Sequence, residues 1–166
     1  MFYLIGPRGS GKTTIGKKLA EQKSCQFVDT DKLIVERAGS SIAQIVEQYG
    51  WEHFRHLESE VLKSISHSDT VVSTGGGIIL LKENQRVMRT NGTVIYLSAT
   101  PEILAARLAA EPQAEQRPSL TGKSILEEIE EVMSQREFLY RETAHYVIDA
   151  GLPIESIIHQ LTQFDK

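Results

Sequence analysis

The fold is decided by the stretch Gly6-Pro7-Arg8-Gly9-Ser10-Gly11-Lys12-Thr13. It fits the phosphate-loop pattern G-x-x-x-x-G-K-[ST] at every fixed position. The loop follows an apolar run that predicts a strand, Phe2 to Ile5, and precedes a helix expected over Thr14 to Gln22. Glycines let backbone amides approach phosphate oxygens, and the start of a helix adds positive potential there. The sequence therefore predicts a binding site for nucleotide phosphates.

The last two residues of this loop carry specific chemistry. We expect Lys12 to reach the β- and γ-phosphates of a nucleotide and the Thr13 hydroxyl to bind Mg²⁺. The chain has no Asn-Lys-x-Asp motif, which small GTPases use to read guanine. The third expected strand ends Val-Val-Ser-Thr-Gly without a carboxylate, so the metal needs a second protein ligand from another strand end.

Five short apolar runs alternate with segments of helical periodicity along the chain. Runs this short are typical of parallel strands covered by helices on both faces. We therefore predict a three-layer α/β/α fold with a parallel sheet, formed as one domain over residues 1–166. The expected strands are Phe2–Ile5, Phe27–Val28, Thr70–Thr74, Thr93–Leu97 and Tyr146–Asp149.

Composition narrows the class of protein. The 166 residues are 40% hydrophobic and 24% charged, which is ordinary for one globular domain. The single cysteine, Cys25, excludes an internal disulfide and a multi-thiolate metal site. The net charge of −4 without a long basic run argues against nucleic acid as partner, and the apolar runs are too short to cross a bilayer. We expect a soluble cytoplasmic protein that acts on small molecules, with a monomer as the default state.

Asp29 and Asp31 place two carboxylates at the expected end of the second strand. One can hold Mg²⁺ while the other accepts the proton of an acceptor hydroxyl. The alternative is structural, because an aspartate at position 31 can also cap the helix that follows.

Two arginines lie in register with apolar stripes on helices. Arg55 borders the stripe of the helix expected from Trp51 to about Ile65, and Arg136 continues the stripe of the helix that ends near Glu142. A buried guanidinium needs a partner. It can be an ion pair within the protein, such as Arg55 with Glu58, or an anionic substrate gripped at two points. Spacing alone leaves both possibilities open.

Two further segments favour a ligand site. Gly75-Gly76-Gly77 at a central strand end lets a ligand approach the backbone closely, although it could be only a flexible turn. Residues 110–123 form a polar segment that is long for a connection, which favours a mobile lid over a plain loop. Arg117 within it is a candidate charge stabiliser on closure. His53 and His56 have no third ligand at a convincing spacing, which argues against zinc.

This set of motifs resembles shikimate kinase, a small phosphate-loop metabolite kinase of the nucleoside-monophosphate-kinase group. The resemblance spans essentially the whole chain. It rests on six motifs in order: the phosphate loop, Asp29-Thr30-Asp31, Phe54-Arg55-x-x-Glu58, Thr74-Gly75-Gly76-Gly77, Arg117-Pro118 and Arg136-x-x-x-Tyr140. Ser119 departs from the bulkier apolar residue often found after Arg-Pro, which affects packing of the lid rather than chemistry.

The resemblance implies the strand order 2-3-1-4-5, with acceptor-binding helices over about residues 31–66. It also implies ATP-dependent phosphorylation of the 3-hydroxyl of shikimate, with Mg²⁺ held by Thr13 and Asp29. The implied catalytic residues are Lys12, Asp31 and Arg117. The implied shikimate contacts are Asp31, Arg55, Gly76, Gly77 and Arg136, with the arginines on the carboxylate. The implied ATP contacts are Gly9, Ser10, Gly11, Lys12, Thr13, Thr14, Arg107, Arg117 and Pro153.

Two other functions fit the residues taken alone. A different small-metabolite kinase, such as a gluconate kinase, would share the phosphate loop without requiring a pair of carboxylate-binding arginines. A regulatory module that binds nucleotide without turnover would not require Lys12, Thr13, Asp29 and Asp31 together. Composition does not name the acceptor, and only the resemblance does so.

Overall fold

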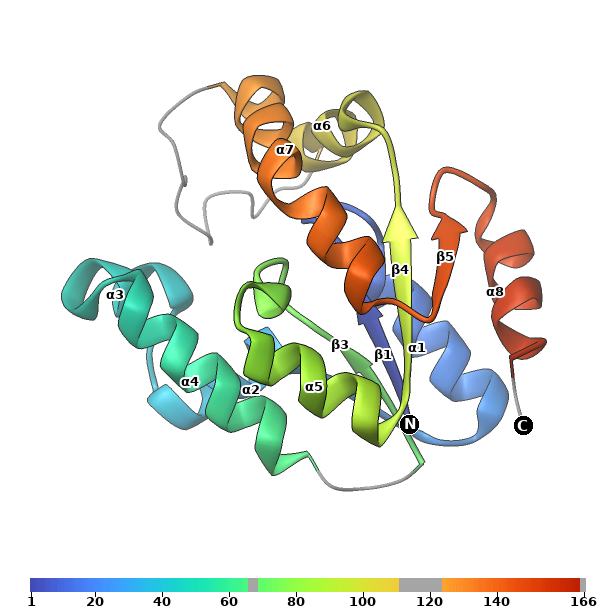
Figure 1. Ribbon diagram of the computed structural model, residues 1–166, viewed down its shortest axis with the longest axis horizontal. Helices are drawn as coiled ribbons and strands as arrows, with labels where there is room; N and C mark the ends of the chain where they lie inside the picture. Colours follow the sequence, from blue (N-terminus) through green and yellow to red (C-terminus); the bar gives the residue numbers. More distant parts are fainter. Residues whose placement is uncertain (66–68, 111–123, 165–166) are drawn as a thin grey trace.

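The computed structural model describes residues 1–65, 69–110 and 124–164, and its centre is a five-stranded sheet (Figure 1). The strand order is β2-β3-β1-β4-β5, and each neighbouring pair is parallel. The predicted sheet and its order are confirmed. The strands are β1 (Phe2–Ile5), β2 (Gln26–Asp29), β3 (Thr70–Ser73), β4 (Thr93–Ser98) and β5 (Tyr146–Asp149).

Side chains along the strands alternate between two apolar cores, one on each face of the sheet. Leu4 of β1 packs toward α1 (Lys12–Lys23) and α8 (Ile154–Thr162), which cover one face. Its neighbours Tyr3 and Ile5 pack in the opposite core. That second core takes residues from α4 (Trp51–Ser64), α5 (Lys82–Asn91), α6 (Pro101–Ala110) and α7 (Ile125–Thr143). The three layers predicted from the short apolar strands are therefore present.

The helices that follow β2 form a smaller unit with a core of its own. Figure 1 shows α2 (Thr30–Ala38), α3 (Ile42–Tyr49) and α4 together on the left, away from α1 and α8. Their shared core consists of Ile34, Ile42, Ile45, Phe54 and Val61. Helix α3 is capped at its start, because the Ser41 hydroxyl accepts a hydrogen bond from the Gln44 amide at 3.1 Å. The side chain of Gln44 returns a bond to the Ser41 amide, which completes a capping box.

Helix α5 and the short 3-10 turn before it (Ile78–Leu80) were not expected from the sequence. The buried positions of α5 include Asn84 and Gln85, which have amide side chains in place of the apolar residues that mark a helical stripe. Asn84 donates to the Ile78 carbonyl at 3.1 Å, and Gln85 donates to the Ile79 carbonyl at 2.6 Å. The two amides therefore hold the turn that follows the triple glycine.

The buried stripe of α7 begins at Ile129, one turn after the start of the helix. Ile125 is 43% exposed, and the buried residues of this helix are Ile129, Met133, Tyr140 and Thr143. Arg136 is half-buried beside this stripe, as its register predicted.

Two observations complete the description. Residues 111–123, which hold most of the predicted lid and Arg117, lie outside the described residues. Within the described ranges, no helix is long and apolar enough to cross a membrane.

Candidate active site

A large cleft lies at the carboxyl ends of the strands, where ligands bind in open parallel sheets. Its volume is about 850 Å³. The phosphate loop, the end of β2, the triple glycine and the segment after β5 all contribute to its walls. Predicted site residues lining it are Gly9, Ser10, Gly11, Lys12, Thr13, Thr14, Asp29, Asp31, Gly76 and Arg107.

The phosphate loop is shaped by glycines in conformations that other residues avoid. Gly9 and Gly11 have φ angles of 85° and 93°, in the left-handed region. Gly11 is the N-cap residue of α1, and no side chain caps this helix end. The first amides of α1 therefore face the cleft, which makes this end of the helix suited to an anion.

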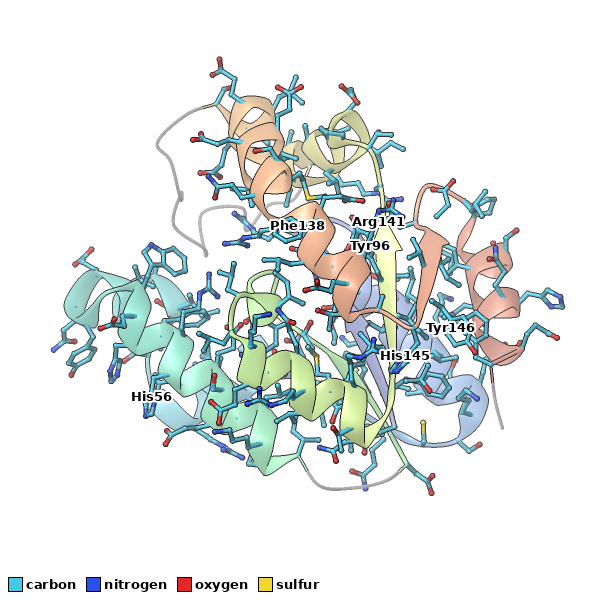
Figure 2. All side chains as sticks on the ribbon, in the orientation of Figure 1. His56, Tyr96, Phe138, Arg141, His145 and Tyr146 are labelled. Atoms are coloured by element: carbon cyan, nitrogen blue, oxygen red, sulfur yellow. The ribbon has the colours of Figure 1, made fainter. Side chains whose placement is uncertain are left out.

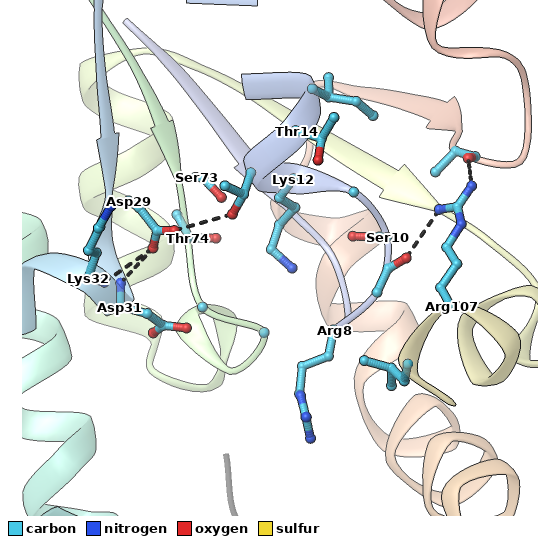
Figure 3. A pocket seen from close by; sticks show the side chains of 18 of the residues that line it. Arg8, Ser10, Lys12, Thr14, Asp29, Asp31, Lys32, Ser73, Thr74 and Arg107 are labelled. Atoms are coloured by element: carbon cyan, nitrogen blue, oxygen red, sulfur yellow. Dashed lines mark hydrogen bonds between the residues drawn. The ribbon is translucent and has the colours of Figure 1, made fainter. Parts of the chain in front are cut away.

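Lys12 has two contacts that organise the loop. Its ammonium group donates to the carbonyls of Gly6 at 2.6 Å and Pro7 at 2.9 Å. The side chain is largely buried and extends into the cleft between the loop and Asp31 (Figure 3). Lys12 therefore braces the loop as well as supplying a positive charge in the cleft.

The two aspartates after β2 have different partners. Asp29 is the N-cap residue of α2, and its Oδ1 accepts from the amides of Asp31 at 3.0 Å and Lys32 at 3.3 Å. Its other oxygen, Oδ2, accepts from the Thr13 hydroxyl at 3.2 Å (Figure 3). The alternative that Asp31 caps this helix is wrong, because Asp29 does so. The Asp31 carboxylate is left to line the cleft.

The pair formed by Thr13 and Asp29 fits a magnesium ion. A hydroxyl and a carboxylate are hard oxygen ligands, and Mg²⁺ is usually held by one or two protein oxygens with phosphates and water completing its shell. In the described part of the chain, no group of three or more His, Cys, Asp or Glu side chains could hold a metal ion. A Mg²⁺ ion held by Thr13 and Asp29 would take its remaining ligands from phosphate oxygens and water.

Gly75 lies against two carboxylates at the floor of the cleft. A Cβ atom at this position would lie 2.7 Å from Glu58 Oε2 and 2.8 Å from Asp31 Oδ1. The Gly75 amide donates to the Thr30 hydroxyl at 3.2 Å, which fixes the backbone there. Glycine is required here because a side chain would displace Asp31 and the fully buried Glu58.

A second, smaller cavity adjoins the cleft. Arg55 and Arg136 both line it, together with Arg8, Gly76 and Leu108, which also line the large cleft. Its volume of about 40 Å³ is room for one small group, such as a carboxylate, rather than for a whole metabolite. The predicted arginine pair is therefore brought to one place, although the two residues are far apart in sequence.

Arg55 forms an ion pair within the protein and also lines the small cavity. Its guanidinium donates to Glu58 Oε1 at 3.1 Å, so the structural ion pair is present. The same guanidinium lines the small cavity and lies 5.2 Å from the Trp51 ring. A Cβ atom at Gly77 would come within 2.5 Å of it, so Gly77 makes room for the guanidinium.

Arg107 connects the phosphate loop to the segment after β5. It donates to the carbonyls of Gly9 at 3.1 Å and Ala150 at 2.7 Å (Figure 3). Leu152 and Ile154 line the cleft beyond it. Pro153 lies between them as the N-cap residue of α8 but does not line the cleft.

Comparison with known proteins now decides the family. The sequence model described as shikimate kinase matches residues 8–166 of the chain. The chain belongs to the shikimate kinase family. Shikimate kinase 2 of Photorhabdus laumondii subsp. laumondii is 53% identical over 157 residues, which are 95% of this chain and 90% of that protein. Shikimate kinase 2 of Salmonella schwarzengrund is 54% identical over 159 residues, which are 96% of this chain and 88% of that protein.

Solved structures of shikimate kinases have the same fold. The enzyme of Acinetobacter baumannii, solved in complex with shikimate, has a TM-score of 0.91 and 33% identity, with 98% of this chain and 90% of that chain covered. The enzyme of Bacteroides thetaiotaomicron has a TM-score of 0.89 and 31% identity, with 98% and 96% covered. The family and fold that the motifs predicted are confirmed.

Four residues at this shikimate kinase site were absent from the predicted set: Arg8, Glu58, Gly75 and Tyr140. Glu58, Gly75 and Tyr140 belong to motifs on which the resemblance rests. The sequence therefore pointed to these residues but did not show what they contact. Arg8 occupies a variable position of the phosphate-loop pattern, which gives no signal in a single sequence.

Proposed function

We propose that the chain transfers the γ-phosphoryl group of ATP to the 3-hydroxyl of shikimate, giving shikimate 3-phosphate and ADP. This reaction belongs to the route to chorismate and the aromatic amino acids. One observation carries the proposal. Two arginines line a carboxylate-sized cavity that shares Gly76 with the phosphate-loop cleft. An acceptor with a carboxylate at one end and a hydroxyl at the other would span that junction.

The acceptor would bind with its carboxylate between Arg55 and Arg136 and its ring beside Gly76. Guanidinium groups bind carboxylates at two points, so they would orient the ring as well as hold it. The reacting hydroxyl would then face the cleft, where Asp31 lies.

Asp31 would act as the general base. As the acceptor oxygen bonds to the γ-phosphorus, its proton passes to the Asp31 carboxylate, and the bond from phosphorus to the β,γ-bridging oxygen breaks. Lys12 and the open amides of α1 would offset the charge on the phosphates. Arg107 would support the nucleotide through its contacts with Gly9 and Ala150. The expected contribution of Arg117 stays a prediction from the sequence.

Mg²⁺ would be held by the Thr13 hydroxyl and the Asp29 carboxylate, which are paired at 3.2 Å. When bound, the ion supplies charge neutralisation for the phosphates. Asp29 is suited to this role because its Oδ1 is engaged in capping α2, which leaves Oδ2 directed to Thr13.

A coupled assay of ADP release tests the proposal. The purified chain is given ATP and Mg²⁺ with shikimate, quinate, gluconate or a nucleoside monophosphate. We expect turnover with shikimate at a kcat/KM far above that for the other acceptors. Lys12→Met is the control and should abolish turnover, because it removes the phosphate-facing charge and the bonds to Gly6 and Pro7. Preference for gluconate or a nucleotide, or ADP release independent of acceptor, would overturn the assignment.

A further inference from the structure

Tyr140 links two of the expected shikimate contacts. It lies on α7 one turn after Arg136, and its side chain is fully buried. Its hydroxyl donates a hydrogen bond to the Gly76 carbonyl at 2.6 Å. Gly76 and Arg136 both line the small cavity, while Tyr140 itself does not. The residue is therefore placed behind the cavity wall, in contact with groups on its surface.

The Arg136 side chain lies close enough to the Tyr140 hydroxyl to lower its pKa. Burial raises the pKa of Tyr140 to about 12, against the opposite effect of Arg136 and Arg55. The hydroxyl thus keeps its proton throughout the physiological range. The hydroxyl gives its proton to the Gly76 carbonyl, so its oxygen lone pairs can face the Arg136 guanidinium, which only donates.

The ring of Tyr140 is held by a second aromatic residue. It stacks on Tyr96 of β4 with ring centroids 4.9 Å apart and 20° between the planes. The Tyr96 hydroxyl donates to Glu137, which also accepts from Arg141 at 2.6 Å. Figure 2 shows Tyr96 and Arg141 where α7 crosses β4. The Tyr140 hydroxyl is consequently fixed relative to the sheet, and so are the groups bound to it.

We propose that Tyr140 is a positioning residue for acceptor binding, which acts by holding the Arg136 guanidinium and the Gly76 backbone in the geometry that receives the acceptor carboxylate. This inference rests on the proposed function, because it assigns Tyr140 to the same acceptor. Asp31 contacts a different part of the cleft wall, at Gly75. Loss of the Tyr140 hydroxyl therefore acts on acceptor binding and leaves the proton transfer in place.

The test compares Tyr140→Phe with Tyr96→Phe. Both changes remove one phenolic oxygen from the same aromatic stack, but only the first removes contacts with Gly76 and Arg136. We expect Tyr140→Phe to raise the KM for shikimate about five- to tenfold, which corresponds to one lost hydrogen bond. The KM for ATP and kcat should stay within about twofold of the wild type. Tyr96→Phe should leave all three constants near the wild-type values.

A double-mutant cycle then asks whether Tyr140 acts through Arg136. If it does, Tyr140→Phe added to Arg136→Lys should raise the shikimate KM by less than the product of the two single effects. Melting temperatures of all variants separate a general loss of stability from a loss of binding. The proposal is overturned if Tyr140→Phe matches Tyr96→Phe in shikimate KM, or if the two effects multiply. If only the Tyr140 proposal is wrong, Arg136→Lys should still raise the KM for shikimate. If Arg136→Lys leaves this KM unchanged, the proposed function itself fails.

Discussion

At the scale of single residues, the three consecutive glycines have different surroundings. Gly75 leaves space for the carboxylates of Asp31 and Glu58, and Gly77 leaves space for the Arg55 guanidinium. A Cβ atom at Gly76 would meet only ordinary contacts, with its nearest neighbours at 3.7 Å. The sequence suggests only that a ligand approaches this backbone. In the structure, Gly75 and Gly77 make room for side chains that the sequence predicts at the site.

This difference predicts that alanine at position 75 lowers stability, whereas alanine at position 76 weakens acceptor binding. Gly75→Ala should lower the free energy of unfolding by about 1–3 kcal/mol, because the fully buried Glu58 cannot move aside easily. Gly76→Ala should keep near-wild-type stability but raise the KM for shikimate, since its new methyl group occupies the junction of the two cavities. Urea denaturation and steady-state kinetics on both variants provide the check. Equal loss of stability at the two positions would contradict the assigned contacts.

At the scale of elements, the strands were predictable because each is a short apolar run bounded by glycine, asparagine or aspartate. The order of the strands came from the resemblance, since periodicity does not fix pairing. Helix α5 could not be found in this way, because its buried side chains include the amides of Asn84 and Gln85. These amides bond to the carbonyls of Ile78 and Ile79, in the turn after the triple glycine, and a helical pattern does not reveal such bonds.

The junction between α7 and β5 gives a prediction about pH. His145 Nδ1 accepts a hydrogen bond from the Val94 amide of β4 at 2.9 Å. Only an unprotonated Nδ1 can accept this bond. Burial lowers the pKa of His145 below its ordinary value of 6.5, and the charge of Arg89 lowers it further. Because the folded state disfavours the proton, this stabilisation is complete above the ordinary pKa and is lost as the pH falls through the folded pKa.

Melting temperatures between about pH 7.5 and pH 5 test this contribution. The wild type should lose stability more steeply on acidification than His145→Gln, which cannot titrate at this position. Parallel curves for the two proteins would show that His145 does not contribute to the pH dependence.

At the scale of the whole molecule, the phosphate-loop cleft and the cavity lined by Arg55 and Arg136 share a wall at Gly76. Most residues on the phosphate-loop side of the cleft were predictable, because one contiguous motif supplies them and its geometry is local. Spacing did not predict that Arg55 and Arg136 share one cavity, because they come from helices on either side of the triple glycine and meet only in the folded chain. Spacing left each arginine free to be structural or functional. Arg55 forms the ion pair with Glu58 and also lines the small cavity, while Arg136 lines the cavity with Tyr140 one turn further along α7.

Arg136→Lys therefore gives the most direct test of the central claim, that a pair of arginines receives the carboxylate of the acceptor. Lysine keeps the charge but loses two-point binding, so the KM for shikimate should rise roughly ten- to a hundredfold. The KM for ATP and the melting temperature should change little, because the phosphate loop is a separate site and Arg136 is only half-buried. A lower melting temperature with equal effects on both substrates, or an unchanged shikimate KM, would contradict the claim.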